Sequence, residues 1–459
     1  MVPHLITALK DPINELEQRI LDSMPAIERW FRLEWMEHTP PFYCSADVRN
    51  AGFKLAPVDT DLFPDGWNNV TPEMLQLSVQ AAMAAIEKIC PEARNLLIIP
   101  ESVARSTFYW SNVLQLKRIF HQAGLNVRFG SLSADVEQPI TINLPTGEAI
   151  TLEPLIRTDR RLGLKNFDPC TILLNNDLAA GIPGILEDLN EQYLLPPLHA
   201  SGSVRRRSTH FKAYEEISKR FGKLLGVDSW LINPMFAPCG EVNFLTGAGL
   251  DVLRSQVDML LTKIKRKYKE YGIHEKPFVV VKNDSCIQSK DIGCNSIGIM
   301  TVRDTKDLDA LVVQAQAHAK ALAAEPAPTP SSASSARKTQ RTTSATTQPQ
   351  SLVVQEGVLT NERVNAAVAE PVVYMMDRYV VGGFYRIHAQ RGLDENLSAP
   401  GASYVPLAFT DSGRLPQLGE KPGTSSPNRF YMYGVIARLA MLAASYELEA
   451  TDPGAEVYE

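Results

Sequence analysis

Residues 95–129 read NLLIIPESVARSTFYWSNVLQLKRIFHQAGLNVRF, and this stretch sets the expected fold class. The apolar run at 96–99 ends in proline and glutamate and predicts a buried strand, because short apolar runs bounded by turn residues suit strands that are covered on both faces. A helix is expected through 114–120, and 127–129 predicts the next strand. Helices that alternate with buried strands are typical of a mainly parallel sheet, so we expect an α/β protein.

The alternation continues on both sides of this stretch. Apolar residues at steps of three and four over 13–31 predict a helix that begins at Asp11 and Pro12, and Thr71 with Pro72 begins another. The remaining expected elements are a strand at 171–174, helices at 208–225 and 251–271, strands at 277–282, 297–302 and 352–356, a hairpin of 372–376 and 379–387 that turns at Asp377 and Arg378, and a helix through 431–448.

Composition changes abruptly at 323–350, where 28 residues include six alanines, six threonines, five serines and four prolines but no large apolar side chain. Such a stretch buries too little apolar surface to offset the entropy of ordering, so we expect a disordered linker or insertion there. The rest is expected to form an N-terminal α/β domain on the substrate side at 1–145, a middle α/β domain at 146–272, and one module made of 273–322 and 351–459.

The composition is that of an ordinary globular protein. The 459 residues contain 46 Lys and Arg against 52 Asp and Glu, a net charge of −6. This balance argues against a chain built mainly to hold nucleic acid phosphates or an anionic membrane. Six scattered cysteines without a C-x-x-C pair, and the absence of a long apolar run, predict a cytoplasmic protein. Together with the charge balance, they predict that it binds neither nucleic acid nor membrane. The oligomeric state stays open.

Common signatures are missing from the sequence. It contains no G-x-x-x-x-G-K-[ST], G-x-G-x-x-G, H-E-x-x-H or G-x-S-x-G motif. These absences argue against P-loop, dinucleotide, zinc-protease and serine-hydrolase sites.

The strongest positive feature is Lys282 at the end of the apolar strand 277–282. A polar loop containing Gly293 and Gly298 follows it, and then the returning strand. A strand–loop–strand with exposed backbone N–H groups can cover a nucleotide triphosphate while the lysine contacts its phosphates. The alternative is a lysine that merely ends a strand.

Acidic residues give a second candidate site. Glu356 ends a strand, and Asp394, Glu395 and Asn396 follow the hairpin. Mg²⁺ prefers oxygen ligands and is usually held by one or two carboxylates together with phosphates. A magnesium site is therefore one interpretation, and an ordinary solvated loop is the other.

Basic residues give a third. Arginines at 157, 160, 161 and 205–207, with His210 and Lys212, lie beside expected strand and helix ends, where guanidinium groups can bind carboxylates in a bidentate manner. Solvated basic faces are the alternative. Cys286 and Cys294, eight positions apart after Lys282, could stiffen that loop, but two incidental thiols fit equally well because no further ligands complete a zinc site.

Long blocks of the sequence resemble the proteobacterial glutamate–cysteine ligase family. They cover nearly the whole chain apart from the linker: 47–69 (DVRNAGFKLAPVDTDLFPDGWNN), 175–183 (NNDLAAGIP), 195–210 (LPPLHASGSVRRRSTH), 230–244 (WLINPMFAPCGEVNF), 267–282 (KYKEYGIHEKPFVVVK) and 354–401 (VQEGV through DENLSAPG). The resemblance implies ATP- and magnesium-dependent formation of γ-glutamylcysteine from glutamate and cysteine, the first step of glutathione synthesis.

The C-terminal half also resembles an ATP-grasp module, in which two lobes hold ATP between antiparallel sheets. The likeness implies that Lys282 and Arg386 act in catalysis. It implies cofactor-binding roles for Lys282, Gln355, Glu356, Val358 and Gly298, substrate-binding roles for Arg49, Lys54, Arg105, Arg206 and His210, and metal-binding roles for Asp394, Glu395 and Asn396.

Two departures from the family pattern keep alternatives open. The loop after Lys282 has seven extra residues and has lost most of its glycines, and 100–106 has lost polar groups although Arg105 is kept. Glycines let backbone amides approach phosphate closely, so their loss suggests a non-catalytic or regulatory relative. A ligase that joins another acid and amine is the third reading.

Overall fold

The structure is a computed structural model. It describes residues 5–7, 11–101, 105–244, 246–285, 299–304, 306–310, 312–313, 316–317, 349–407 and 430–454. Gly298, Cys286, Cys294 and nearly all of the expected linker 323–350 lie outside these residues.

The chain divides into two compact units. Unit 1 comprises Met1–Arg205, Thr209–Asn233 and Val358–Glu459, and unit 2 comprises Arg206–Ser208 and Pro234–Gly357. Both contain sheets and helices, so the protein is of mixed α/β class. The units run across the four segments expected from the sequence, and those segment boundaries stay a prediction.

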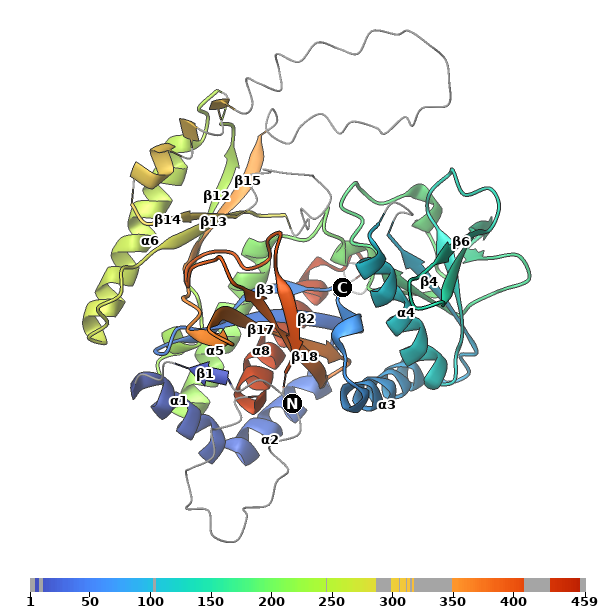
Figure 1. The fold of residues 1–459 in the computed structure, drawn as a ribbon, viewed down its shortest axis with the longest axis horizontal. Coiled ribbons are helices and arrows are strands. Elements are labelled where there is room, and N and C mark those ends of the chain that lie inside the picture. The colour runs from blue at the N-terminus through green and yellow to red at the C-terminus, as the bar shows by residue number, and fades with distance from the viewer. Residues whose placement is uncertain are drawn as a thin grey trace. The chain divides into compact units, whose positions relative to one another are not determined.

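A seven-stranded antiparallel sheet in unit 1 joins strands from the two halves of the chain (Figure 1). In it, β2 (Tyr43–Asn50) pairs with β3 (Leu55–Asp61) and with β17 (Ala367–Met376), and β17 pairs with β18 (Tyr379–His388). The outer strands are β1 (Leu5–Thr7), β16 (Glu362–Val364) and β19 (Ser403–Pro406). The hairpin expected at Asp377 is confirmed; this residue has φ +48°, a left-handed conformation that aspartate tolerates comparatively well.

The second sheet of unit 1 has six strands and is mainly parallel, as expected. Its order is β11-β10-β4-β5-β7-β6, and only β6 and β7 pair in antiparallel fashion. The strands are β4 (Asn95–Pro100), β5 (Asn126–Ser131), β6 (Ile140–Asn143), β7 (Ala149–Pro154), β10 (Thr171–Asn175) and β11 (Tyr193–Leu195). Thr71 and Ser106 cap α3 (Pro72–Ile89) and α4 (Thr107–Gln122) by accepting hydrogen bonds from backbone N–H groups, the usual way to satisfy a helix start.

The prediction of a single helix over 13–31 is wrong: the structure has two helices there, α1 (Asp11–Asp22) and α2 (Met24–Glu37). The chain breaks at Ser23 because Pro25 has no N–H to donate and its ring clashes with the preceding turn. The backbone N–H of Ile27 then donates to the Ser23 carbonyl at 2.9 Å and begins α2.

The last helix, α8 (Phe430–Thr451), is buried along most of its length and packs against β2, β3 and β17. Its apolar residues surround the helix, which is typical of a helix in a protein core. Unit 1 also contains most of α5 (Arg207–Leu225), the short pair β8 (Ile156–Thr158) and β9 (Arg161–Gly163) and, among its described residues, four short 3-10 helices. Within the described parts of the chain, no helix has the length and apolar character needed to cross a membrane.

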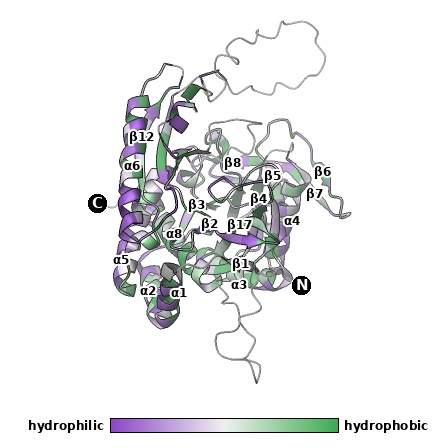
Figure 2. Cartoon of the chain, turned by 60° about the vertical axis from the view of Figure 1, so that its left-hand side comes forward, coloured by the Kyte–Doolittle hydropathy of each residue, from purple (hydrophilic) through white to green (hydrophobic). Residues whose placement is uncertain are grey.

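Unit 2 is built on a four-stranded antiparallel sheet of order β12-β15-β13-β14. Its strands are β12 (Phe236–Val242), β13 (Val279–Asn283), β14 (Ile299–Val302) and β15 (Gln350–Glu356). The amphipathic helix α6 (Leu250–Glu270), on which hydrophilic and hydrophobic residues alternate in Figure 2, packs against β12, β13 and β15. The expected return strand after Lys282 is therefore confirmed.

Candidate functional site

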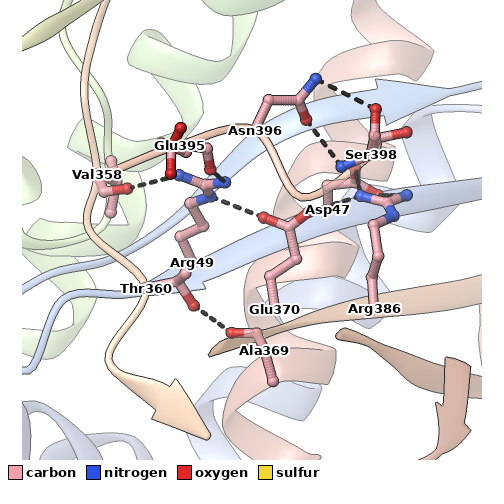
Figure 3. A network of polar contacts seen from close by, with 10 residues as sticks. All are labelled: Asp47, Arg49, Val358, Thr360, Ala369, Glu370, Arg386, Glu395, Asn396 and Ser398. Atoms are coloured by element: carbon pink, nitrogen blue, oxygen red, sulfur yellow. Dashed lines mark hydrogen bonds and ion pairs between the residues drawn. The ribbon is translucent and has the colours of Figure 1, made fainter. Parts of the chain in front are cut away.

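Two arginines and two carboxylates meet on one face of the seven-stranded sheet (Figure 3). Asp47 and Arg49 are two residues apart on β2, while Glu370 and Arg386 face each other across β17 and β18. Residues two apart on a strand, and residues opposite each other on paired strands, point to the same face. Strand alternation therefore brings four charged side chains together from distant parts of the sequence.

Glu370 lies between the two arginines. Its Oε2 accepts from Arg49 Nε at 2.7 Å, and its Oε1 accepts from Arg386 Nη1 at 2.7 Å. Arg386 Nη1 also donates to Asp47 Oδ2 at 2.6 Å. Glu370 is 2% exposed, so the network is largely removed from water, where charge-assisted hydrogen bonds are strong.

The two carboxylates of this network differ in acidity. Burial alone raises the pKa of Glu370, but the charges of Arg49 and Arg386 and their hydrogen bonds hold it below its ordinary value. Burial raises the pKa of Asp47 despite the charge of Arg386, and the charge of Glu370 raises it further. Asp47 is therefore the carboxylate of the pair that takes up a proton first as the pH falls.

Arg49 also holds the backbone around the predicted metal residues. Its Nη2 donates to the carbonyl of Glu395 at 2.7 Å, and its Nη1 donates to the carbonyl of Val358 at 3.3 Å. The arginine that we expected to bind substrate thus fixes two segments of unit 1. We did not predict Glu370, the main partner of Arg49, because it lies inside an apolar strand 321 positions away.

The predicted metal residues use several of their polar atoms within their own turn. Glu395 Oε2 accepts from the N–H of Gly392 at 2.6 Å and its Oε1 pairs with Arg391 at 3.1 Å. Asn396 Oδ1 accepts from the N–H of Ser398 at 2.9 Å, and Asp394 is partly exposed beside them. Over the described residues, no group of three or more His, Cys, Asp or Glu side chains is placed to hold a metal ion.

In unit 2, Lys282 and Gln355 lie on the same face of the four-stranded sheet. Lys282 pairs with Val353, and Val280 pairs with Gln355, so both side chains project from one side of β13 and β15. Val280 on this face is only half-buried, whereas Val279 and Val281 on the other face are buried. A lysine and an amide thus share the more open face of the sheet.

Gln355 carries a polar group that the protein leaves unsatisfied. The residue is 2% exposed, and among the described residues its Nε2 has no hydrogen-bond partner. Buried polar atoms are nearly always paired in folded proteins, so an orphaned amide is a site at which a ligand or water completes the hydrogen bonding. This is the clearest local indication of a binding site in unit 2.

The neighbouring predicted cofactor residue lies on the opposite face. Glu356 Oε2 accepts a hydrogen bond from the N–H of Met235 at 2.9 Å. The pKa of Tyr268 on α6 is raised, mainly by burial of Tyr268 and also by the negative charge of Glu356. Gly357 follows, and a Cβ there would lie 2.1 Å from the ring of Phe278, so only glycine fits. The side chain of Glu356 thus lies on the side of α6 rather than beside Lys282.

The predicted substrate residues are distributed over both units. Arg206 forms a backbone bridge with Ser285, three residues after Lys282 in unit 2. In unit 1, His210 Nδ1 lies 3.1 Å from Glu447 Oε2, and Lys54 stacks its ammonium 4.3 Å from the Trp230 ring centroid. His210 is 2% exposed and Lys54 1% exposed, so in this conformation both are core residues rather than surface groups.

A further polar cluster marks the carboxyl end of the parallel sheet, the edge where α/β proteins usually bind ligands. Tyr109 Oη accepts from the N–H of Glu101 at 2.8 Å and lies 3.1 Å from Asn175 Oδ1. Asn112 Nδ2 donates to the same oxygen at 3.2 Å. Arg105, predicted to line the substrate site, pairs with Glu101 at 3.4 Å. We did not predict Tyr109 or Asn112, although the strand-end position of Asn175 signals this edge.

Comparisons with known proteins place the chain in a family. The model of the glutamate-cysteine ligase family GshA matches residues 17–327 and 330–448. A solved protein of Methylobacillus flagellatus KT, provisionally described as a gamma-glutamylcysteine synthetase, is 46% identical, with a TM-score of 0.80 over 98% of this chain and 100% of that one. None of the curated proteins compared with the chain matches it.

A second solved structure is much less similar. It is a glutathione synthetase-like effector of Globodera pallida in its apo form, 11% identical, with a TM-score of 0.35 over 88% of this chain and 85% of that one. A likeness of this size supports no argument about the fold. The family model and the 46% identity suffice, and the chain belongs to the glutamate-cysteine ligase family.

Proposed function

We propose that this chain joins the γ-carboxylate of glutamate to the amine of cysteine at the expense of ATP, with the nucleotide bound on the Lys282 face of unit 2. Family membership supports the reaction and the use of ATP. The proposed position of the nucleotide rests on Gln355 Nε2, which is buried without a hydrogen-bond partner among the described residues. Gln355 lies on the same sheet face as the buried Lys282. In this proposal the sheet and α6 form one lobe of an ATP-grasp-like module.

The proposed reaction requires the protein to position the substrates and to stabilise negative charge, and it requires no nucleophilic side chain. The glutamate carboxylate takes the γ-phosphoryl group of ATP to give an acyl phosphate, and the cysteine amine then displaces phosphate. Lys282 is 6% exposed, and a lysine in such surroundings stabilises phosphate charge more strongly than one in water. Gln355 orients the adenine through its amide, and the backbone of 355–357 lines the same site.

In unit 1, we propose that the arginines act mainly through the network around Glu370. Arg386, held by Asp47 and Glu370, remains a candidate catalytic residue of unit 1, and Arg49 positions the turn that carries Asp394, Glu395 and Asn396. At the carboxyl end of the parallel sheet, Arg105 and the Tyr109–Asn175 cluster offer groups that suit an amino acid substrate. Arg206, beside Ser285, supplies a further cation in unit 2.

Magnesium is kept as part of the proposal on chemical grounds only. Among the described residues, no group of three or more His, Cys, Asp or Glu side chains is placed to hold the ion. Mg²⁺ usually enters such sites with the phosphates and takes only one or two protein carboxylates. Asp394 and Glu395 are the candidates for that number of ligands.

Coupled product formation tests the reaction. We expect ADP and phosphate release from ATP to require both glutamate and cysteine, with γ-glutamylcysteine formed in equal amount. The assay uses the full chain with Mg-ATP and a panel of acids and amines. Equal ATP turnover without either amino acid would contradict the proposal, and turnover with another pair would identify a ligase of different specificity. Micromolar Mg-ATP binding without turnover would favour a regulatory relative.

Replacing Gln355 with methionine should have opposite effects on stability and on nucleotide binding. The change removes the buried Nε2 that has no partner among the described residues, so the free energy of unfolding of the ligand-free chain should stay equal or rise by about 1 kcal/mol. Loss of the hydrogen bond to ATP should raise its Kd roughly 5- to 10-fold, about 1 to 1.4 kcal/mol. Denaturant unfolding and calorimetry with Mg-ATP measure the two.

The control for this change is Gln192→Met in unit 1. Gln192 is also buried, but its amide is satisfied: Nε2 donates to the carbonyl of Leu162 at 2.8 Å and Oε1 accepts from the N–H of Leu162 at 2.6 Å. That variant should lose stability and keep its affinity for ATP. A Gln355→Met chain that is destabilised and binds ATP normally would remove Gln355 from the nucleotide site.

A further inference from the structure

Two of the cysteines, 80 positions apart, meet at the amino end of the parallel sheet. The Sγ of Cys90 donates a hydrogen bond to the Sγ of Cys170 at 3.0 Å. Both residues are partly exposed thiols, whereas Cys44 is fully buried and Cys239 is 7% exposed. Within the described part of the chain, these are the thiols that contact each other and can also be reached from solvent.

The backbone holds this pair from several sides. Cys90 ends α3, where its N–H donates to the Ile86 carbonyl at 2.8 Å. Cys170 immediately precedes β10, and its carbonyl accepts from the N–H of Tyr193 at 2.9 Å. Asn95 Nδ2 donates to the carbonyl of Asp168 at 3.2 Å and ties the segment after Cys90 to the segment before Cys170. The contact is therefore part of the sheet architecture.

We infer that Cys90 and Cys170 are a reversible redox site, which a low-molecular-weight disulfide converts into an intrachain disulfide. The sulfurs need to approach by about 1 Å from their present contact to reach bonding distance. Neither residue belongs to the proposed nucleotide or amino acid sites, since β10 reaches the polar cluster only at its other end, Asn175. This inference does not depend on the proposed function.

The exchange balances as two successive displacements. One cysteine, as thiolate, attacks a sulfur of the small disulfide RSSR and expels RS⁻; the second cysteine loses its proton and attacks the mixed disulfide, expelling another RS⁻. The protein gives up two electrons and two protons, and RSSR becomes two RSH. The hydrogen bond to Cys170 and partial burial raise the pKa of Cys90 to about 11, which disfavours the thiolate of Cys90 as the first nucleophile.

Peptide mapping after treatment with hydroxyethyl disulfide tests the inference on the full chain. Trypsin cuts after Lys88, Arg94, Lys165 and Arg205, so the bond should link peptide 89–94 to peptide 166–205, with the loss of two hydrogen atoms. Dithiothreitol should separate the two peptides. The linked pair should also form in the matched control Cys239→Ser, because that cysteine is buried elsewhere.

Single variants separate a resolving pair from two independent thiols. In Cys90→Ser, Cys170 should remain as a stable mixed disulfide because no second thiol displaces the small group, and Cys170→Ser should trap Cys90 in the same way. Both reduced variants should keep the ligase activity of the unmodified chain. Mixed disulfides on both cysteines of one chain, a link to Cys286 or Cys294 instead, or no reaction at either thiol would each overturn the inference.

A stability measurement gives an independent readout. A bond across 80 positions restricts the unfolded chain, so the oxidised protein should unfold several degrees above the reduced one. Dithiothreitol and the Cys90→Ser substitution should both abolish the difference. Equal melting temperatures with the linked peptide present would show that the bond strains unit 1, and would contradict a site that accepts the bond without strain.

Discussion

A chain with Lys282 replaced by methionine is expected to lose about 100-fold in kcat/KM for the complete ligase reaction, roughly 2.7 kcal/mol of transition-state stabilisation. Lys282 ends β13 and is 6% exposed, on the same sheet face as Gln355. If the nucleotide binds on this face as proposed, the charge of Lys282 acts on phosphate through a low dielectric, and methionine keeps the length of the side chain without the charge. Steady-state kinetics with saturating glutamate and cysteine measure the loss.

Lys276→Met is the control for this variant. Lys276 lies six residues earlier, before the same strand, and is exposed. Loss of an exposed charge away from the sheet face should leave kcat/KM within about twofold, because such surface changes are weakly coupled to a buried site. If Lys282→Met kept both normal turnover and normal affinity for ATP, the nucleotide would have to be placed elsewhere.

The second large effect is expected on stability. Glu370→Gln should lower the free energy of unfolding by about 3 kcal/mol, because it removes the negative charge that pairs two buried arginines. Glutamine has nearly the same shape, so the loss reports on charge rather than on packing. Chemical denaturation measured by circular dichroism gives the difference in midpoint and slope, and an unchanged slope shows that the extent of unfolding is the same.

An exposed glutamate–arginine pair supplies the comparison. Glu148 pairs with Arg118 at 2.5 Å, but their side chains are 40% and 47% exposed. Glu148→Gln should therefore cost less than about 1 kcal/mol, since water and salt screen the pair. Equal losses for Glu148→Gln and Glu370→Gln would mean that the buried network contributes no more than a surface ion pair.

The stability difference between the parent chain and Glu370→Gln should also depend on pH. The pKa of Glu370 is lowered in the folded chain, so its contribution is fully present above the ordinary glutamate pKa of about 4.3 and is lost as the pH falls through the lower folded value. Asp47, with a raised pKa, acts with the opposite sign, and Glu370→Gln removes the part of that rise which the charge of Glu370 causes. A difference that did not shrink as the pH fell below the ordinary glutamate pKa would contradict this prediction.

Much of the local structure was predictable because its causes are local. Thr71 and Ser106 cap helices through hydrogen bonds to residues three positions on, and the apolar run at 96–99 is buried on both faces. The return strand after Lys282 and the hairpin at Asp377 follow from patterns of fewer than about 25 residues. The break at Ser23 was equally local, and the chemistry of Pro25 explains it.

The long sequence blocks also sufficed for the family, which the comparisons confirm. The sequence blocks do not determine which face of a sheet each predicted site residue occupies. Lys282 and Gln355 share one face because β13 and β15 pair in a particular register, and the same register sends Glu356 to the other face. A shift by one residue would reverse all three positions, so the order of residues along one strand does not determine which of them meet.

The contacts that depend on tertiary structure join residues far apart in the chain. Arg49 and Glu370 are 321 positions apart, and Cys90 and Cys170 are 80 apart. They meet because β2 pairs with β17, and because the end of α3 lies beside the start of β10. Helix caps, apolar strands and family sequence blocks depend on residues that are close together in the sequence. The buried charge network and the thiol pair arise only when burial of apolar surface brings distant strands into one sheet.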